Sequence, residues 1–291
     1  MLGISTCWWY TRTLQGDTIP REALDLGLDG LELEYRITEP LYHQMKPYLK
    51  ENMRVFSIHN YFPFPKEAPG GKGSGDLFLL SSTDQEERLK AVQYTIRTMD
   101  HAHELGVGAV ILHLGRVEMP YQRASISSPD FVKDLRPIRE ARHGEHLHAV
   151  LRSLEGLNRE AEWRGLFLGI ENRYHFNEIP DFEELRIILD RFKGGNVGYW
   201  HDVGHAAAQE KMGIIPQRRL LEEYGERLIG IHLHDIRGLS DHLAPGKGAL
   251  NFAEIKPFLK PSHLKIIEVH PHVSREDLTQ GIRFLREEGI C

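Results

Sequence analysis

The chain has 291 residues, of which 41% are hydrophobic and 27% are charged, and its formal net charge is -6. This composition excludes a disordered chain, and no apolar stretch approaches the roughly 20 residues that a membrane-spanning helix needs. The negative charge disfavours a protein that binds nucleic acid through phosphate contacts. Cys7 and Cys291 cannot form a disulfide framework and the N-terminus lacks a signal-peptide layout, so we expect a cytoplasmic location.

Eight apolar, strand-like runs alternate with helix-period segments along the chain. Most of the runs are nearly continuous apolar stretches, which is typical of strands that are covered on both faces. They begin near Leu2, Gly30, Arg54, Gly108, Leu166, Asn196, Leu228 and Leu264.

Helix start and stop signals separate these runs. Thr83-Asp-Gln-Glu86 is a capping box, and Gly106 is suited to end the helix that follows it. Residues 181–184 and 274–277 mark the starts of two more helices. The repeat predicts a single α/β domain over residues 1–291, folded as a (β/α)8 TIM barrel. A doubly wound sheet is the competing architecture, but it would concentrate its site at one switch point.

Two connections exceed the usual length of a loop between strand and helix. Residues 60–82 are rich in Pro and Gly, whereas residues 114–145 mix arginines with acidic residues. Long loops are more often functional than filler, so we expect both to cover a site, with a surface excursion as the alternative. The histidines within and just after the second segment, His143, His146 and His148, are expected to be exposed.

Acidic and imidazole side chains recur where six of the strand-like runs end. They are His59, His113, Glu171, Asp202, His234 and Glu268. Each one alone is readily explained as a structural residue, for example a helix cap at Asp202. Together they would converge at the mouth of the barrel, where buried ionisable groups are costly unless they are paired or coordinated. The set therefore predicts a divalent-metal site and a metalloenzyme.

Four of these residues, Glu171, Asp202, His234 and Glu268, supply three carboxylates and one imidazole. Such a set suits Mn, Co, Fe or Zn and leaves positions open for substrate or water. A carboxylate that binds a metal through one oxygen keeps the other free to take a proton, so one residue can serve as ligand and base.

Four short motifs carry a resemblance to a known family. They are Ile-Glu-Asn-Arg at 170–173, His-Asp-Val-Gly-His at 201–205, His-Leu-His-Asp at 232–235 and Ile-Glu-Val-His at 267–270. In this order they resemble the xylose isomerase-like TIM-barrel superfamily, which includes sugar isomerases and epimerases and the endonuclease IV type of apurinic endonuclease (AP endonuclease family 2). The resemblance implies that Glu171, Asp202, His234 and Glu268 hold one metal ion. It also implies that His205 contacts the substrate or a further metal.

The ketose 3-epimerases of this superfamily use the two ligand glutamates as acid and base on opposite faces of the sugar. Their pattern has a second Glu six residues after the first and an Arg six residues after the His. Here Asn177 and Ser240 occupy those places, with Glu178 and Arg237 nearby. The departure weakens an assignment to ketohexoses and leaves the implied metal site intact.

The endonuclease IV branch has extra histidines after strands three and four and a ligand group after strand seven. His59, His113 and His205 match this pattern, and Asp241-His242 resembles the last group with its acid one residue out of register. The branch implies two or three metal ions. We find no basic, aromatic-interleaved loops of the kind that grip a duplex.

Three functions follow as hypotheses. The first is a metal-dependent isomerase or epimerase of a sugar, polyol or related hydroxy-carbonyl compound, with enediolate-like proton transfer by Glu171 and Glu268. The alternative is a phosphoester hydrolase with two or three zinc-type ions, in which His59 and His113 bind an additional ion. A third is a barrel that binds a small ligand without turning it over. We expect a small carbohydrate-like partner and no nucleic acid or membrane, and we leave a homodimer open.

Overall fold

The computed structural model describes residues 1–11, 15–66, 68, 73–119 and 129–291. Residues 12–14, 67, 69–72 and 120–128 lie outside the described part, and all but the first of these segments belong to the two long connections. Among the described residues, no helix combines the length and apolarity that crossing a bilayer demands.

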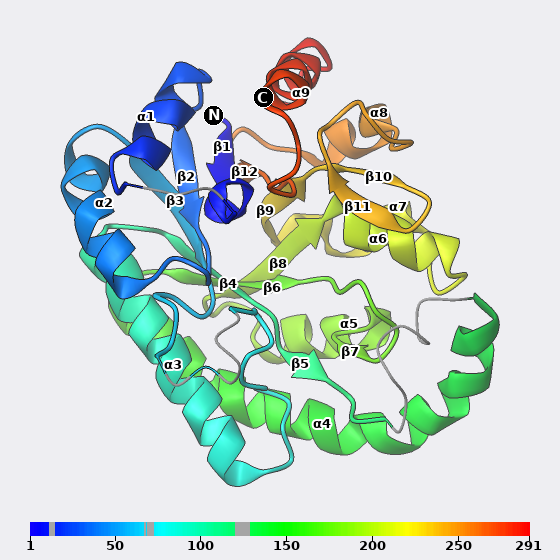
Figure 1. The fold of residues 1–291 in the computed structure, drawn as a ribbon. Coiled ribbons are helices and arrows are strands. Elements are labelled where there is room, and N and C mark those ends of the chain that lie inside the picture. Colours follow the sequence, from blue (N-terminus) through cyan, green and yellow to red (C-terminus); the bar gives the residue numbers. More distant parts are fainter. Residues whose placement is uncertain (12–14, 67, 69–72, 120–128) are drawn as a thin grey trace.

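Eight parallel strands close into a barrel, and their order around it follows the chain (Figure 1). They are β1 (Gly3–Ser5), β2 (Gly30–Leu33), β3 (Arg54–His59), β4 (Ala109–Leu112), β6 (Phe167–Glu171), β8 (Val197–Asp202), β9 (Leu228–Leu233) and β12 (Leu264–Ile267). The pairing of β1 with β12 closes the ring. The predicted (β/α)8 barrel is confirmed.

Helices surround the barrel, and two short antiparallel sheets lie beside its carboxyl-terminal end (Figure 1). The α-helices are α1 (Thr18–Asp25), α2 (Glu39–Glu51), α3 (Gln85–Glu104), α4 (Pro129–Arg164), α5 (Phe182–Arg191), α6 (Val203–Lys211), α7 (Gln217–Tyr224), α8 (Phe252–Ile255) and α9 (Arg275–Glu287). Single 3-10 turns are η1 (Thr6–Trp9), η4 (Gly225–Arg227) and η5 (Lys256–Phe258). The small sheets pair β5 (Gly115–Arg116) with β7 (Glu178–Ile179) and β10 (Asp235–Arg237) with β11 (Ser240–Leu243).

The helix caps agree with the sequence except at α3. There the N-cap is Asp84, whose carboxylate accepts hydrogen bonds from the backbone N–H groups of Glu86 and Glu87. The capping box expected to start at Thr83 is therefore wrong by one residue, because the Asp84 carboxylate accepts from these amides itself. The reciprocal capping box between Asp181 and Glu184 is confirmed at α5.

The second long connection is shorter than expected, because α4 starts at Pro129 and continues for 36 residues. The dense mixture of charges in residues 129–145 is the solvent side of a helix, while Val132 and Leu135 are buried on its inner side. His146 is buried as well, and its Nδ1–H donates to the carbonyl of Ser81 at 2.8 Å. Its expected exposure is wrong because the inner face of α4 needs a donor for that carbonyl.

Large rings fill the amino-terminal half of the barrel where neighbouring strands carry glycine. A Cβ atom at Gly30 would lie 2.6 Å from the ring of Phe56, and one at Gly230 would lie 2.3 Å from the ring of Trp200. Both rings belong to a buried apolar cluster at this end of the barrel. His59, Glu171 and Asp202 lie at the opposite end, where β3, β6 and β8 finish.

We predict that Arg139→Met destabilises the fold by about 3–5 kcal/mol, because Glu184 would be left as a buried, unpaired charge. Arg139 contacts Glu184 at 2.7 Å and Asp181 at 2.6 Å, and both Arg139 and Glu184 are almost inaccessible to solvent. Urea denaturation followed by circular dichroism measures the change. The matched control Arg186→Met breaks an exposed pair with Glu183 and should cost less than about 1 kcal/mol. Equal losses in the two variants would contradict the prediction.

Candidate functional site

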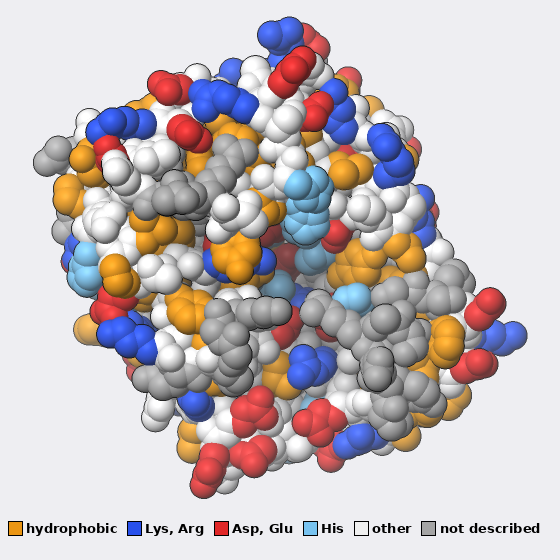
Figure 2. Space-filling view, viewed as in Figure 1, with side chains coloured by type: hydrophobic (Ala, Val, Ile, Leu, Met, Phe, Trp, Pro, Cys, Tyr) orange, Lys and Arg blue, Asp and Glu red, His pale blue; other side chains and the backbone are white. Residues whose placement is uncertain are grey.

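A cavity of about 680 Å³, called the main cavity here, lies over the carboxyl ends of the barrel strands. Figure 2 shows this hollow, with imidazole and acidic side chains gathered at its bottom. Its lining includes Cys7, Tyr10, Tyr35, Arg36, His59, His113, Glu171, Arg173, His175, Glu178, His205, Asp241, His242, Glu268, His270 and His272. Of the six strand-end residues predicted to converge, His59, His113, Glu171 and Glu268 line this pocket, whereas Asp202 and His234 are fully buried and do not line it.

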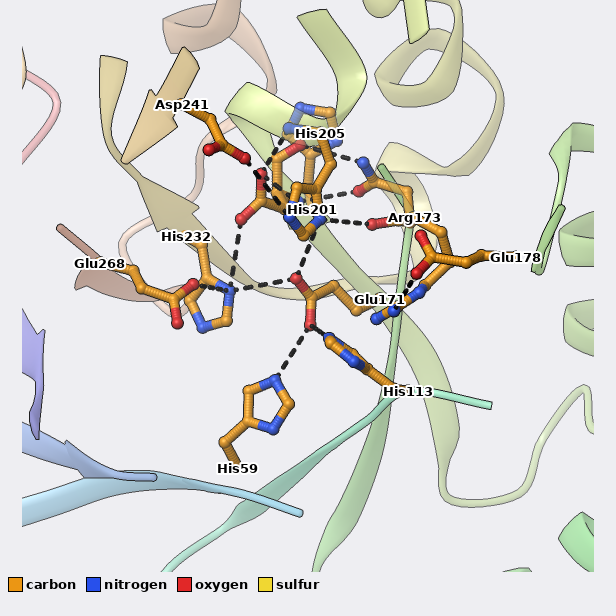
Figure 3. Close-up of polar contacts among 12 residues, drawn as sticks. His59, His113, Glu171, Arg173, Glu178, His201, His205, His232, Asp241 and Glu268 are labelled. Carbon is orange, nitrogen blue, oxygen red and sulfur yellow. Dashed lines mark hydrogen bonds and ion pairs between the residues drawn. The ribbon is translucent and has the colours of Figure 1, made fainter. Parts of the chain in front are cut away.

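Glu171, at the end of β6, lies between two groups of imidazoles (Figure 3). Its Oε2 atom is 3.2 Å from Nε2 of His59 and 3.0 Å from Nε2 of His113. Its Oε1 atom is 3.3 Å from Nδ1 of His205 and 3.5 Å from Nδ1 of His232. Both oxygens of this buried carboxylate therefore face nitrogen atoms.

Glu171, Asp202 and Glu268, called the central carboxylates here, approach one another around His232. One ligand atom from each of these four residues lies within 4.8 Å of the others. The Nδ1 atom of His232 is 3.1 Å from Glu268 Oε2 and 3.7 Å from Asp202 Oδ2. The sequence argument missed His232, although residues two apart on a strand share a face and His232 precedes His234 by two.

His234 lies on the other side of Asp202. Its Nδ1 atom accepts a hydrogen bond from the backbone N–H of His242, so the Nε2–H donates to the Asp202 carboxylate at 3.0 Å. Asp202, His234 and His242 form a second group of potential ligands. Asp202 is thus shared between the group that contains His234 and the group that contains His232.

Two more groups complete the site. His59 and His113 share Glu171, and His205 shares Asp241 with His242. Of the residues suggested as further contacts to a metal or the substrate, Arg237 lies apart: it is exposed and donates to the carbonyl of Lys247 at 2.7 Å. It is not part of the described lining of the main cavity.

One wall of the main cavity is a stack of imidazole rings. The rings of His234 and His242 are 4.2 Å apart, and those of His242 and His270 are 4.9 Å apart, both nearly parallel. His270 is exposed while His234 is buried, so the stack runs from solvent to the central carboxylates.

Contacts between carboxylates and imidazoles set the charges of the site. Burial alone would raise the pKa of Glu171 and of Asp202, but the imidazoles beside them hold both pKa values well below the ordinary range. Burial lowers the pKa of His205, but Asp202 and Glu171 more than offset this and raise it to about 9. The carboxylates are therefore charged and need positive partners.

The residues present fit a divalent cation. The Nε2–H of His232 donates to Glu32 at 3.0 Å, so a neutral ring would present the lone pair of Nδ1 to the central carboxylates. No described residue makes a hydrogen bond to this buried Nδ1 atom. The lone pair of Nδ1 and the carboxylate oxygens repel each other. A proton on Nδ1, or a cation between this nitrogen and the oxygens, would relieve that repulsion. Carboxylate oxygens with imidazole nitrogens are the usual ligands of Zn, Mn, Fe and Co.

Comparisons with known proteins agree on the fold. A family model described as a xylose isomerase-like TIM barrel matches residues 20–288. A putative xylose isomerase from Rhodospirillum rubrum superposes with a TM-score of 0.74 at 17% identity, covering 100% of this chain and 98% of that one. A D-tagatose 3-epimerase-like protein gives 0.71 at 19% identity, covering 99% and 97%.

A protein from Thermus thermophilus, whose crystal was soaked with zinc chloride, gives a TM-score of 0.60 at 23% identity, covering 99% of this chain and 97% of that one. A sequence search among curated proteins found no match. At these identities the similarity to solved structures establishes the shared fold.

We predict that Glu32 and His232 stabilise the protein as a coupled pair. Both side chains are fully buried, and Ser57 also donates to Glu32, at 2.8 Å. A double-mutant cycle of Glu32→Gln and His232→Gln in chelator-treated protein should give a coupling of about 0.5–3 kcal/mol. Urea denaturation measures each variant. A cycle of Glu32→Gln with the distant His146→Gln serves as the control, and additive losses in the first cycle would refute the coupling.

Proposed function

Because this chain belongs to the xylose isomerase-like TIM-barrel family, we propose that it is a divalent-metal-dependent isomerase or epimerase. Its substrate is a sugar, polyol or related hydroxy-carbonyl compound. The observation that carries the proposal is the convergence of Glu171 and Glu268 with Asp202 at the floor of one cavity. The likeness to a D-tagatose 3-epimerase-like protein and a putative xylose isomerase supports it.

The central carboxylates would hold the metal, with His232 as the nitrogen ligand. His234, which the sequence suggested for this role, accepts a hydrogen bond at Nδ1 and carries its proton on Nε2, so the neutral ring has no free lone pair to offer. A divalent ion bound there supplies a Lewis acid that polarises adjacent hydroxyl and carbonyl oxygens of a substrate. The polarisation acidifies the C–H bond beside the carbonyl, so that a carboxylate is a strong enough base to remove its proton.

Glu268 is the better-placed base. Its contacts with His232 and His242 both use Oε2, so Oε1 is left for the main cavity among the described residues. Its side chain is 10% exposed, against 1% for Glu171. Glu268 would take the proton from one carbon and, for an isomerisation, return it to the neighbouring carbon, while the hydroxyl proton passes from one of the two adjacent oxygens to the other.

An epimerisation needs a second proton donor on the opposite face of the substrate. Glu171 fills this role together with His113 and His205, which contact its two oxygens at 3.0 Å and 3.3 Å. These contacts occupy both oxygens of Glu171, so its proton would be exchanged with an imidazole rather than taken from solvent.

We predict that Glu268→Gln lowers kcat by about 10²–10⁴-fold, because the amide cannot take the proton. Glutamine has nearly the same shape as glutamate, so the circular dichroism spectrum of the variant should match that of the unchanged protein. Turnover of a sugar panel in the metal-loaded protein provides the measurement, with Glu254→Gln on the exposed side of α8 as the control. An unchanged rate in Glu268→Gln would remove this residue from the mechanism.

A second candidate function is phosphoester hydrolysis with two or three zinc-type ions. One specific observation favours it: Glu171 stands between the pair His59 and His113 and the other two central carboxylates, as a bridging ligand of two ions would. The group of His205, Asp241 and His242 offers ligands for a third ion.

Counting bound ions separates the two candidates. One tightly held ion per chain, unchanged in the double variant His59→Ala/His113→Ala, is expected for the isomerase. For the hydrolase we expect two or three ions. The double variant should then lose one of them, because the ion bound by His59 and His113 would lose two of its ligands. Plasma mass spectrometry of dialysed protein measures the count. His43→Ala, which removes an exposed imidazole on α2, is the control.

A further inference from the structure

A smaller cavity of about 240 Å³, called the side cavity here, adjoins the main cavity, and His175 and Glu178 line both. It lies between the first turns of α4, the segment that joins β6 to α5, and the turn between α6 and α7 (Figure 1). The rest of its described lining comprises Arg136, Phe176, Asp181, Phe182, Glu183, Gln209, Ile214, Ile215, Pro216 and Arg219.

The carboxylates that line the side cavity are all paired with arginines outside it. Asp181 pairs with Arg139 at 2.6 Å, Glu183 with Arg186 at 2.8 Å, and Glu178 with Arg173 at 3.1 Å. Arginines outside the side cavity therefore offset the negative charges of these carboxylates.

The two arginines that line the side cavity have no such partners. The guanidinium of Arg219 lies 4.9 Å from the ring centre of Phe182, and that of Arg136 lies 5.6 Å from the ring centre of Phe176. Neither makes a side-chain hydrogen bond or an ion pair with any residue that the structure describes. Stacking on a ring holds a guanidinium in place while its N–H groups stay free to bind an oxyanion.

The sizes of the two cavities suit a ligand larger than one free monosaccharide. Pockets of about 300–1,000 Å³ enclose ligands of drug size, and the main cavity alone has about 680 Å³.

We propose that the side cavity binds an oxyanion group, a phosphate or a carboxylate, at the end of the substrate remote from the reacting carbon. Arg136 and Arg219 provide the donors for this group, and the segment of His175 and Glu178 joins it to the reaction centre. The proposal rests on the proposed function only in that it takes the main cavity as the substrate site.

Isothermal titration of the metal-loaded protein tests this assignment with three probes: D-fructose, D-fructose 6-phosphate and D-glucuronate. We expect at least one of the two anionic probes to bind about tenfold or more tightly than D-fructose, because it gains charge-assisted hydrogen bonds. The preferred anion then distinguishes a phosphate from a carboxylate substrate.

The double variant Arg136→Gln/Arg219→Gln should abolish this preference and leave the affinity for D-fructose unchanged. The matched control is Arg218→Gln, which removes the same charge from the neighbouring residue, whose guanidinium is paired with Glu222 at 2.7 Å. Thermal unfolding of each variant verifies that it is folded. An anion preference that survives in the double variant, or no preference in the unchanged protein, would overturn the proposal.

The measurement also separates this proposal from the proposed function, since binding needs no turnover. Tight, arginine-dependent binding of an anionic probe without isomerisation would leave the side cavity assigned and the isomerase proposal refuted. Turnover of D-fructose with no preference for either anion would support the isomerase proposal and overturn the assignment of the side cavity.

Discussion

Mutual repulsion among the three central carboxylates is the constraint on which the rest of the site depends. Glu171, Asp202 and Glu268 are brought close together in a buried place, where like charges are costly unless cations or protons offset them. The surrounding imidazoles are arranged around that need. His59 and His113 face one side of Glu171, and His232 faces all three carboxylates. A bound divalent ion would satisfy the same need more completely.

The barrel makes this arrangement possible because apolar side chains fill one end of its interior and the central carboxylates lie at the other end. Glycines at one end admit the rings of Phe56 and Trp200, which fill the interior with apolar atoms. The polar contacts between Ser57, Glu32 and His232 then connect this packed part to the central carboxylates. Strand ends thereby hold the reactive side chains on rigid supports, as precise metal coordination requires.

The outer elements, and not the barrel strands, form the side cavity. The side cavity is bordered by α4, by the β6–α5 segment and by the turn after α6, not by barrel strands. Arg139 of α4 pairs with Asp181 and with the buried Glu184, and these ion pairs hold α4 against the segment that joins β6 to α5. If the central carboxylates hold a metal and the side cavity recognises the substrate, as proposed, recognition could change without changing the metal site, as expected where one fold serves different functions.

The barrel and most of the candidate site could be predicted from the sequence, because both follow from local patterns. Apolar runs mark buried strands, and polar residues at their ends mark the mouth, so Glu171, Asp202, Glu268, His59 and His113 could be named in advance. Their roles as ligands and bases stay predictions. What the sequence left undecided depends on contacts between distant segments.

Only the tertiary structure decided that His232 as well as His234 lies against the central carboxylates, since strand period places both on the same face and only packing sets their distances. It also decided that residues 129–145 are helical, because a helix covered by charges looks like a loop until its buried face finds a partner. Likewise, Arg136 and Arg219 have no ion-pair partner among the described residues because other arginines occupy the nearby carboxylates. Pairing between segments far apart in the chain has no local signature, so folding alone determines it.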